Sequence, residues 1–130
     1  YELSDSVCRS VREICACGRP FTLLEGIQGR TSDLLSFSTA SGDQVMVNPH
    51  LFSQIMDCVS AREWQIVQQR EGLRILLSGG QGERQEETLL QAVRQALAAQ
   101  GVSVPPIWIE RVAALPRNES GKVTPIVPVT

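Results

Sequence analysis

The chain has 130 residues, of which 42% are hydrophobic and 20% charged, an ordinary composition for one globular domain or a fragment of a larger protein. Twelve basic and fourteen acidic side chains leave a net charge of −2, which gives no electrostatic footprint for nucleic acid or an anionic membrane surface. No apolar run approaches the roughly 18 residues that span a bilayer, and no signal peptide opens the sequence. We therefore expect a cytoplasmic chain without nucleic-acid or membrane partners. Because it begins with Tyr1 rather than Met, we expect an excised or processed piece.

The first forty residues contain many turn formers and only short extended candidates, at residues 22–28 and 33–37. A more regular pattern starts with a short strand over residues 44–47. Asn48 is then a helix-capping residue, and Pro49 suits the first helical position. Apolar residues at i, i+4 spacing predict a short helix from there to Val59.

Alternating apolar residues predict two strands at 63–70 and 73–78, joined as a hairpin by Glu71-Gly72. The glycine-rich residues 78–82 lack the spacing and the Lys-Ser/Thr of a phosphate-binding loop, so we interpret them as a linker. Residues 83–100 form the best predicted helix, which Gly101 ends. The last predicted strand covers residues 107–112.

The elements from residue 44 to residue 112 follow the order strand, helix, strand, strand, helix, strand. This order is that of the split βαβ arrangement, in which an antiparallel sheet carries two helices on one face. The fold class is therefore predicted as α+β with a βαββαβ core. We expect residues 113–130, which contain three prolines, to form an irregular and flexible tail.

The four cysteines leave a choice between reduced thiols and a metal site. Cys15 and Cys17 are separated by one residue, Cys8 lies seven residues upstream, and Cys58 belongs to an apolar helical pattern that suggests the core. Structural zinc usually has two close pairs of ligands, so reduced thiols are favoured and zinc is an alternative that we do not predict. His50, the sole histidine, is expected to be exposed or to cap a helix rather than to act in catalysis.

Three short segments are the strongest candidates for a binding site: Tyr1-Glu2-Leu3-Ser4-Asp5, Gly29-Arg30-Thr31-Ser32-Asp33-Leu34-Leu35 and Leu115-Pro116-Arg117-Asn118-Glu119-Ser120-Gly121-Lys122. Asp5 supplies a carboxylate that can bind a ribose diol, and Arg30 a planar group suited to ribose or phosphate oxygens. Lys122 is the only lysine and follows a glycine. Each segment also has a plain interpretation, as a frayed terminus, a polar turn and a solvated tail.

The order and spacing of the three segments resemble the C-terminal end of adenylate-forming enzymes, the acyl-CoA synthetase superfamily, and most closely its phenylacetate-CoA ligase-like branch. Tyr1 to Asp5 resembles the ribose-binding aspartate motif, and Gly29 to Leu35 the hinge between the large domain and the small lid. Leu115 to Lys122 resembles the lid loop with the adenylation lysine. The stretch Cys15-Ala16-Cys17-Gly18-Arg19-Pro20 is also similar to this branch.

The resemblance implies a ligase that activates a small-molecule carboxylate with ATP and then passes the acyl group to a thiol such as coenzyme A. It implies a catalytic role for Lys122 and nucleotide-binding roles for Asp5 and Arg30. Residues 1–33 would be the end of the large-domain region with the hinge, and residues 34–130 the lid. ATP and Mg²⁺ would be bound mainly by an N-terminal adenylation domain of the same polypeptide, without which the chain would be inactive.

A second function class remains open at this point. The chain can be a non-catalytic interaction module that uses its sheet as a binding surface, with a structural zinc near Cys8, Cys15 and Cys17. The acyl substrate, the acceptor and the oligomeric state do not follow from these residues.

Overall fold

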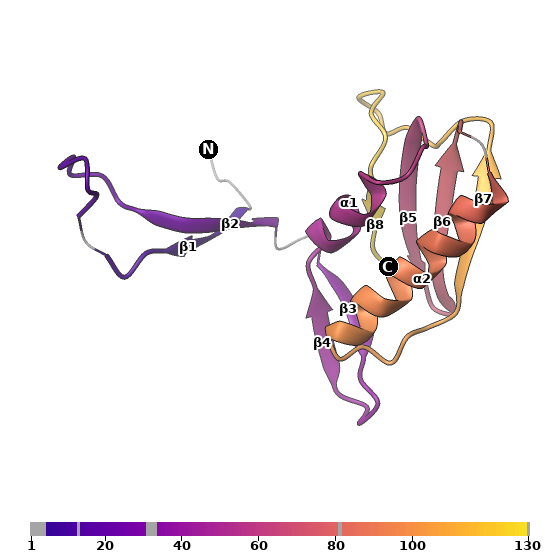
Figure 1. Ribbon diagram of the computed structural model, residues 1–130, viewed down its shortest axis with the longest axis horizontal. Helices are drawn as coiled ribbons and strands as arrows, with labels where there is room; N and C mark the ends of the chain where they lie inside the picture. The colour runs from indigo at the N-terminus through magenta and orange to yellow at the C-terminus, as the bar shows by residue number, and fades with distance from the viewer. Residues whose placement is uncertain (1–4, 13, 31–33, 81, 130) are drawn as a thin grey trace. The chain divides into compact units, whose positions relative to one another are not determined.

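The computed structural model describes residues 5–12, 14–30, 34–80 and 82–129, and these form two helices and eight strands (Figure 1). The chain divides into two compact units, Tyr1–Asp33 and Leu34–Thr130. The elements in chain order are β1 Asp5–Arg9, β2 Leu24–Arg30, β3 Leu35–Ser38, β4 Gln44–Val47, α1 His50–Met56, β5 Glu63–Gln69, β6 Gly72–Ser78, α2 Glu83–Ala99, β7 Ile107–Val112 and β8 Ile126–Val127.

The first unit is a two-stranded antiparallel sheet of β1 and β2, with register shifts after Ser6 and after Cys8. The ladder continues for one step beyond the strands, where the Ser10 N–H donates to the Leu23 carbonyl over 2.9 Å. The sequence predicted an extended segment near β2 but not β1. Apolar and polar residues do not alternate over Asp5 to Arg9, and the partner strand begins fifteen residues further along the chain. The local sequence therefore does not indicate this strand.

The second unit has a four-stranded sheet in the order β7-β6-β5-β8 (Figure 1). β5 and β6 form the predicted antiparallel hairpin, and the pairing of Gln69 with Gly72 places Arg70 and Glu71 in the turn, one residue before the predicted position. β7 is parallel to β6, and β8 is parallel to β5. The α+β class is confirmed, whereas the expectation of an entirely antiparallel sheet is wrong.

The connections between the strands explain the mixed sheet. β6 and β7 are joined through the long helix α2, and a helical crossover of this length allows neighbouring strands to run parallel. β4 does not join this sheet; it pairs with β3 in a separate hairpin, with Leu35 opposite Val47. The fourth strand of the sheet is β8, which comes from the segment expected to be an irregular tail.

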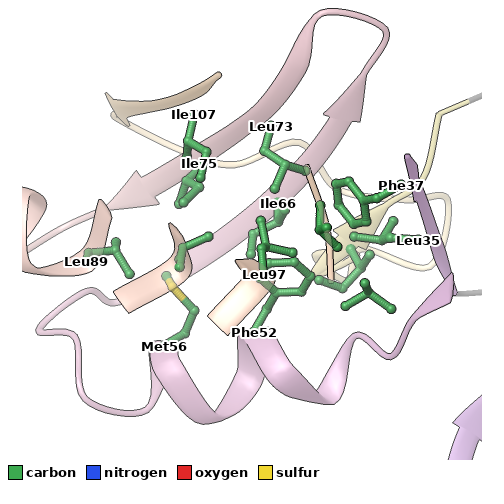
Figure 2. Close-up of a cluster of buried hydrophobic side chains, with 14 of the residues drawn as sticks. Leu35, Phe37, Phe52, Met56, Ile66, Leu73, Ile75, Leu89, Leu97 and Ile107 are labelled. Carbon is green, nitrogen blue, oxygen red and sulfur yellow. The ribbon is translucent and has the colours of Figure 1, made fainter. Parts of the chain in front are cut away.

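Both helices pack on one face of the four-stranded sheet. Figure 2 shows Phe52 and Met56 of α1 and Leu97 of α2 gathered around Ile66 and Ile75 of the central strands. The side chains of this core are fully or almost fully buried, and burying each of them stabilises the fold by about 1.5–3 kcal/mol. The β3–β4 hairpin contributes further core residues, namely Leu35, Phe37 and Val47.

Helix α1 begins at His50, one residue after Pro49, the predicted first helical position. The Asn48 side-chain oxygen accepts a hydrogen bond from the His50 N–H over 2.9 Å, and Pro49 directly before the helix already has helical backbone angles. The helix ends at Met56, earlier than the apolar stripe suggests. Cys58 therefore lies beyond the helix and is exposed, so its assignment to the core is wrong.

Helix α2 ends in the way expected from Gly101. The Gly101 N–H donates to the Ala98 carbonyl over 3.0 Å, and the Val102 N–H donates to the Leu97 carbonyl over 3.2 Å. With Gly101 at φ +80°, this is a Schellman motif, and the buried Leu97 and Val102 side chains belong to one core cluster. Neither helix is long and apolar enough to cross a membrane, a finding that covers the described residues.

Candidate functional site

Asp5 and Arg30 are brought together by the register of the first unit. The two residues are paired across β1 and β2, although twenty-four residues separate them in the chain. Directly opposed residues in an antiparallel ladder have Cα atoms about 4.5–5.5 Å apart. The side chains of both residues lie outside what the structure describes, as do residues 1–4 of the first segment and residues 31–33 of the predicted hinge segment.

Lys122 lies in the second unit, on a turn built around Asn118. The Asn118 side-chain oxygen accepts three hydrogen bonds: from the Ser120 N–H over 3.1 Å, from the Ser120 hydroxyl over 3.0 Å and from the Lys122 N–H over 3.0 Å. Two backbone bonds close the turn, from the Asn118 N–H to the Lys122 carbonyl over 2.9 Å and from the Gly121 N–H to the Asn118 carbonyl over 2.8 Å. Gly121 has φ +75°, a conformation that glycine adopts without steric cost.

Arg117 connects this turn to the sheet. Its Nη1 donates to the Gly121 carbonyl over 3.0 Å, and its Nη2 forms an ion pair with the Glu63 Oε1 over 2.8 Å. Glu63 is the first residue of β5, so a strand of the central sheet holds the loop. In Figure 1 the yellow segment between β7 and β8 forms this loop beyond one end of the sheet.

The Lys122 side chain is exposed and makes no hydrogen bond or ion pair with the described residues. An unpaired ammonium group on an ordered turn can bind an anionic oxygen of a ligand without first breaking a protein contact. Residues 113–130 were expected to form a flexible tail, and the hydrogen-bonded turn was not predicted. Arg117 and Glu63 meet only in the folded chain, so the sequence does not show their contact. Asn118 and Gly121 are turn formers, and this was the one local signal available.

The cysteines do not gather into a metal centre. No group of three or more potential metal ligands occurs among the residues that the structure describes. The Cys17 N–H donates to the Cys15 sulfur over 3.5 Å, and a side-chain hydrogen bond with Cys15 lowers the pKa of the exposed Cys17 thiol. This arrangement stabilises the thiolate form of Cys17.

Two other candidates have structural explanations. His50 is exposed, and its ring lies 3.3 Å from the Gln54 amide nitrogen on the same helix, which agrees with a role at a helix start. The glycine-rich linker after β6 presents its carbonyl groups to Arg111, whose guanidinium donates to Gly79 and Gly80 over 3.3 and 3.1 Å. These bonds bind the linker to β7.

The sequence matches no protein-family model and no curated protein. Among solved structures, the chain is similar to a 2-hydroxyisobutyryl-CoA ligase in the postadenylation state with R3-HIB-AMP, with a TM-score of 0.57 and 21% identity. The likeness covers 96% of this chain and 27% of that one. The chain therefore has the fold of the matching segment of this CoA ligase. The resemblance to adenylate-forming enzymes is thus confirmed at the level of the fold.

A second structure of the same ligase, in an open conformation with 2-HIB-AMP and CoA, is also similar. It has a TM-score of 0.50 and 20% identity, over 95% of this chain and 27% of the other. The chain therefore spans about a quarter of the length of the ligases that it resembles. At these identities the likeness concerns the fold, and the roles of Asp5, Arg30 and Lys122 remain proposals.

Proposed function

We propose that the chain is the C-terminal lid part of an ATP-dependent, carboxylate-activating ligase of the acyl- or aryl-CoA type, close to the phenylacetate-CoA ligases. The observation that carries the proposal is the Lys122 turn. It presents the only lysine of the chain, exposed and unpaired among the described residues, on a loop that hydrogen bonds hold to the sheet. The fold shared with a CoA ligase and the order of the three motifs support the same conclusion.

In the first step, a carboxylate oxygen attacks the α-phosphorus of ATP and pyrophosphate leaves, which gives an acyl-adenylate. Negative charge is concentrated on the phosphate and carboxylate oxygens as they approach each other. The Lys122 ammonium would bridge these oxygens and stabilise the charge that develops between them. Because the turn is ordered before the reactants bind, little reorganisation would be needed at the moment of reaction.

Asp5 and Arg30 would bind the nucleotide. A carboxylate can accept hydrogen bonds from both ribose hydroxyls, and a guanidinium can donate to ribose or phosphate oxygens. Their pairing in the β1–β2 register supports a shared ligand, because both residues then lie within the length of one nucleoside. In the second step, a thiol such as that of coenzyme A attacks the acyl carbonyl, forms the thioester and releases AMP.

The partner of the chain would be an N-terminal adenylation domain of the same polypeptide, which binds most of the ATP, the Mg²⁺ and the acyl group. The exposed apolar side chains of the first unit support such a partner. Ile27 is 72% exposed and Phe21 68%, and a two-stranded sheet without a core is at best marginally stable in water. Residues 29–35 would act as the hinge on which the lid turns between the two steps.

The test is carboxylate-dependent ATP–pyrophosphate exchange by the complete polypeptide. We expect Lys122→Ala to lower the exchange rate by about two orders of magnitude or more, because it removes a preorganised charge at the reacting oxygens. Arg94→Ala is the control, since it removes an exposed positive charge from α2 of the same unit. Exchange that is unchanged in Lys122→Ala would refute the catalytic role of Lys122.

A further inference from the structure

Within the Lys122 turn, one peptide group is held at both ends. The carbonyl of Gly121 accepts from Arg117 over 3.0 Å, and the N–H of Lys122 donates to the Asn118 side chain over 3.0 Å. Both groups belong to the peptide that joins Gly121 to Lys122. A peptide group is planar, so fixing its oxygen and its nitrogen fixes the orientation of the whole plane. That plane sets the position of the Lys122 Cα atom from which the side chain departs.

The hydrogen bonds with Asn118 and with Arg117 connect this peptide to different parts of the domain. Asn118 belongs to the turn itself, so its hydrogen bonds shape the turn without fixing it to the rest of the domain. Arg117 uses the other arm of its guanidinium on Glu63, fifty-four residues away, over 2.8 Å. Glu63 pairs with Ser78 at the end of the β5–β6 ladder, which belongs to the central sheet. A planar guanidinium holds both acceptors in one fixed geometry, whereas the three donors of a lysine ammonium group rotate and impose no such geometry.

We propose that Arg117 is a positioning residue for Lys122, because it clamps the Gly121–Lys122 peptide to the first residue of β5 through Glu63. This inference rests on the proposed function, in which Lys122 meets the reacting oxygens. It goes beyond that function by assigning the orientation of the Gly121–Lys122 peptide to the ion pair between Arg117 and Glu63. A displacement of about 1 Å at a catalytic group can cost about 100-fold in rate.

The first test measures the order of the turn directly and requires no activity. Because Lys122 is the only lysine, the 130-residue chain labelled with [15N]lysine has a single labelled backbone amide. We expect an order parameter near 0.85 in the unmodified chain and a fall below about 0.6 in Arg117→Gln and in Glu63→Gln. Arg74→Gln is the matched control, because Arg74 forms a comparably exposed ion pair with Glu110 on β7, with Nε and Oε2 2.8 Å apart. An order parameter that stays near 0.85 in Arg117→Gln would overturn the proposal.

The second test measures adenylate formation by the complete polypeptide. Arg117→Gln should lower kcat by about 10- to 100-fold while KM for ATP changes by less than about twofold, because a displaced lysine impairs the chemical step more than binding. Arg117→Lys keeps a positive charge opposite Glu63 but lacks the planar guanidinium, so it should retain only part of the wild-type kcat. Arg74→Gln should leave the rate unchanged.

The outcomes separate the two claims. If Lys122→Ala leaves the adenylation rate intact, the proposed function of Lys122 is wrong and no role remains for Arg117 in positioning it. If Lys122→Ala abolishes the rate but Arg117→Gln retains it, the catalytic role stands and the positioning role is refuted. A parallel loss of kcat and melting temperature in Arg117→Gln, with the order parameter unchanged, would also refute it, because it would reveal a merely structural contact.

Discussion

Gly80 occupies a place that no other residue can take without moving its neighbours. Its φ is +82°, and a Cβ atom added to it would lie 1.7 Å from the Ser60 carbonyl oxygen. The loop after β6 therefore passes directly against the backbone that leads into β5. Gly101 has almost the same φ, +80°, but a Cβ atom there would meet no atom within 4 Å. At both positions an L-residue would adopt an unfavourable left-handed backbone conformation, but only at Gly80 would its Cβ atom also clash with a neighbour.

Alanine substitutions at Gly80 and Gly101 therefore distinguish the cost of backbone strain from the cost of a steric clash. We expect Gly101→Ala to lower the free energy of unfolding by about 1–2 kcal/mol, the cost of a left-handed backbone for an L-residue. Gly80→Ala should cost the same plus the displacement of the Ser60 carbonyl, for a total of at least about 3 kcal/mol. Urea denaturation of both variants checks this, and equal losses would show that the loop yields without cost.

At the scale of the element, β8 is a strand of two residues that closes one edge of the sheet. Ile126 pairs with Ile66 and Val127 with Val67 in a parallel arrangement. The Ile66 N–H also donates to the Pro125 carbonyl over 2.8 Å, and the buried Gln65 side chain donates to the Thr124 carbonyl over 2.8 Å. β5 thus has a backbone partner on both sides, and the segment after the Lys122 turn is fixed to it.

The anchoring of β8 depends on one buried side chain. Ile126 is 8% exposed and belongs to the core cluster, whereas Val129 on the same segment is 43% exposed. We expect Ile126→Ala to lower the free energy of unfolding by about 2–3 kcal/mol through the cavity that it leaves. Val129→Ala should change it by less than about 0.5 kcal/mol. Thermal and urea denaturation test the difference, and a small effect of Ile126→Ala would mean that β8 is not part of the cooperative fold.

At the scale of the whole molecule, the core lies entirely in the second unit. Every residue of the buried cluster falls between Leu35 and Ile126. The first unit consists of one hairpin whose described apolar side chains, such as Ile27, are largely exposed. The two units therefore differ in their ability to fold alone, because a hydrophobic core is the main favourable term in folding.

Residues 34–130 should fold without the first unit. We expect this fragment to melt cooperatively within about 5 °C of the 130-residue chain, which corresponds to about 1 kcal/mol. A peptide of residues 1–33 should show no cooperative transition, because a lone two-stranded sheet is marginal in water. Circular dichroism with temperature distinguishes the two. A fragment 34–130 that lacks a cooperative transition would show that the hairpin contributes to the stability of the second unit.

Elements that depend on local interactions could be predicted from the residues. The apolar periodicity of α2, its end at Gly101 and the hairpin of β5 with β6 rest on interactions within a few residues, and all three were predictable. The α+β class followed from their order. The turn residues Asn118 and Gly121 and the position of Lys122 were also visible, and the resemblance carried by three short segments indicated the fold family that the comparison with solved structures supports.

The contacts between distant segments could be seen only in the folded chain. No local sequence pattern indicates that β5 pairs in parallel with β8 or that β4 stays outside the four-stranded sheet. The same holds for the register that places Asp5 opposite Arg30. Strand pairing depends on backbone groups that every residue carries, so the partner of a short strand is chosen by packing and chain connection. The ion pair of Arg117 with Glu63 has the same origin, because its two members come together only when the loop after β7 is placed against the start of β5.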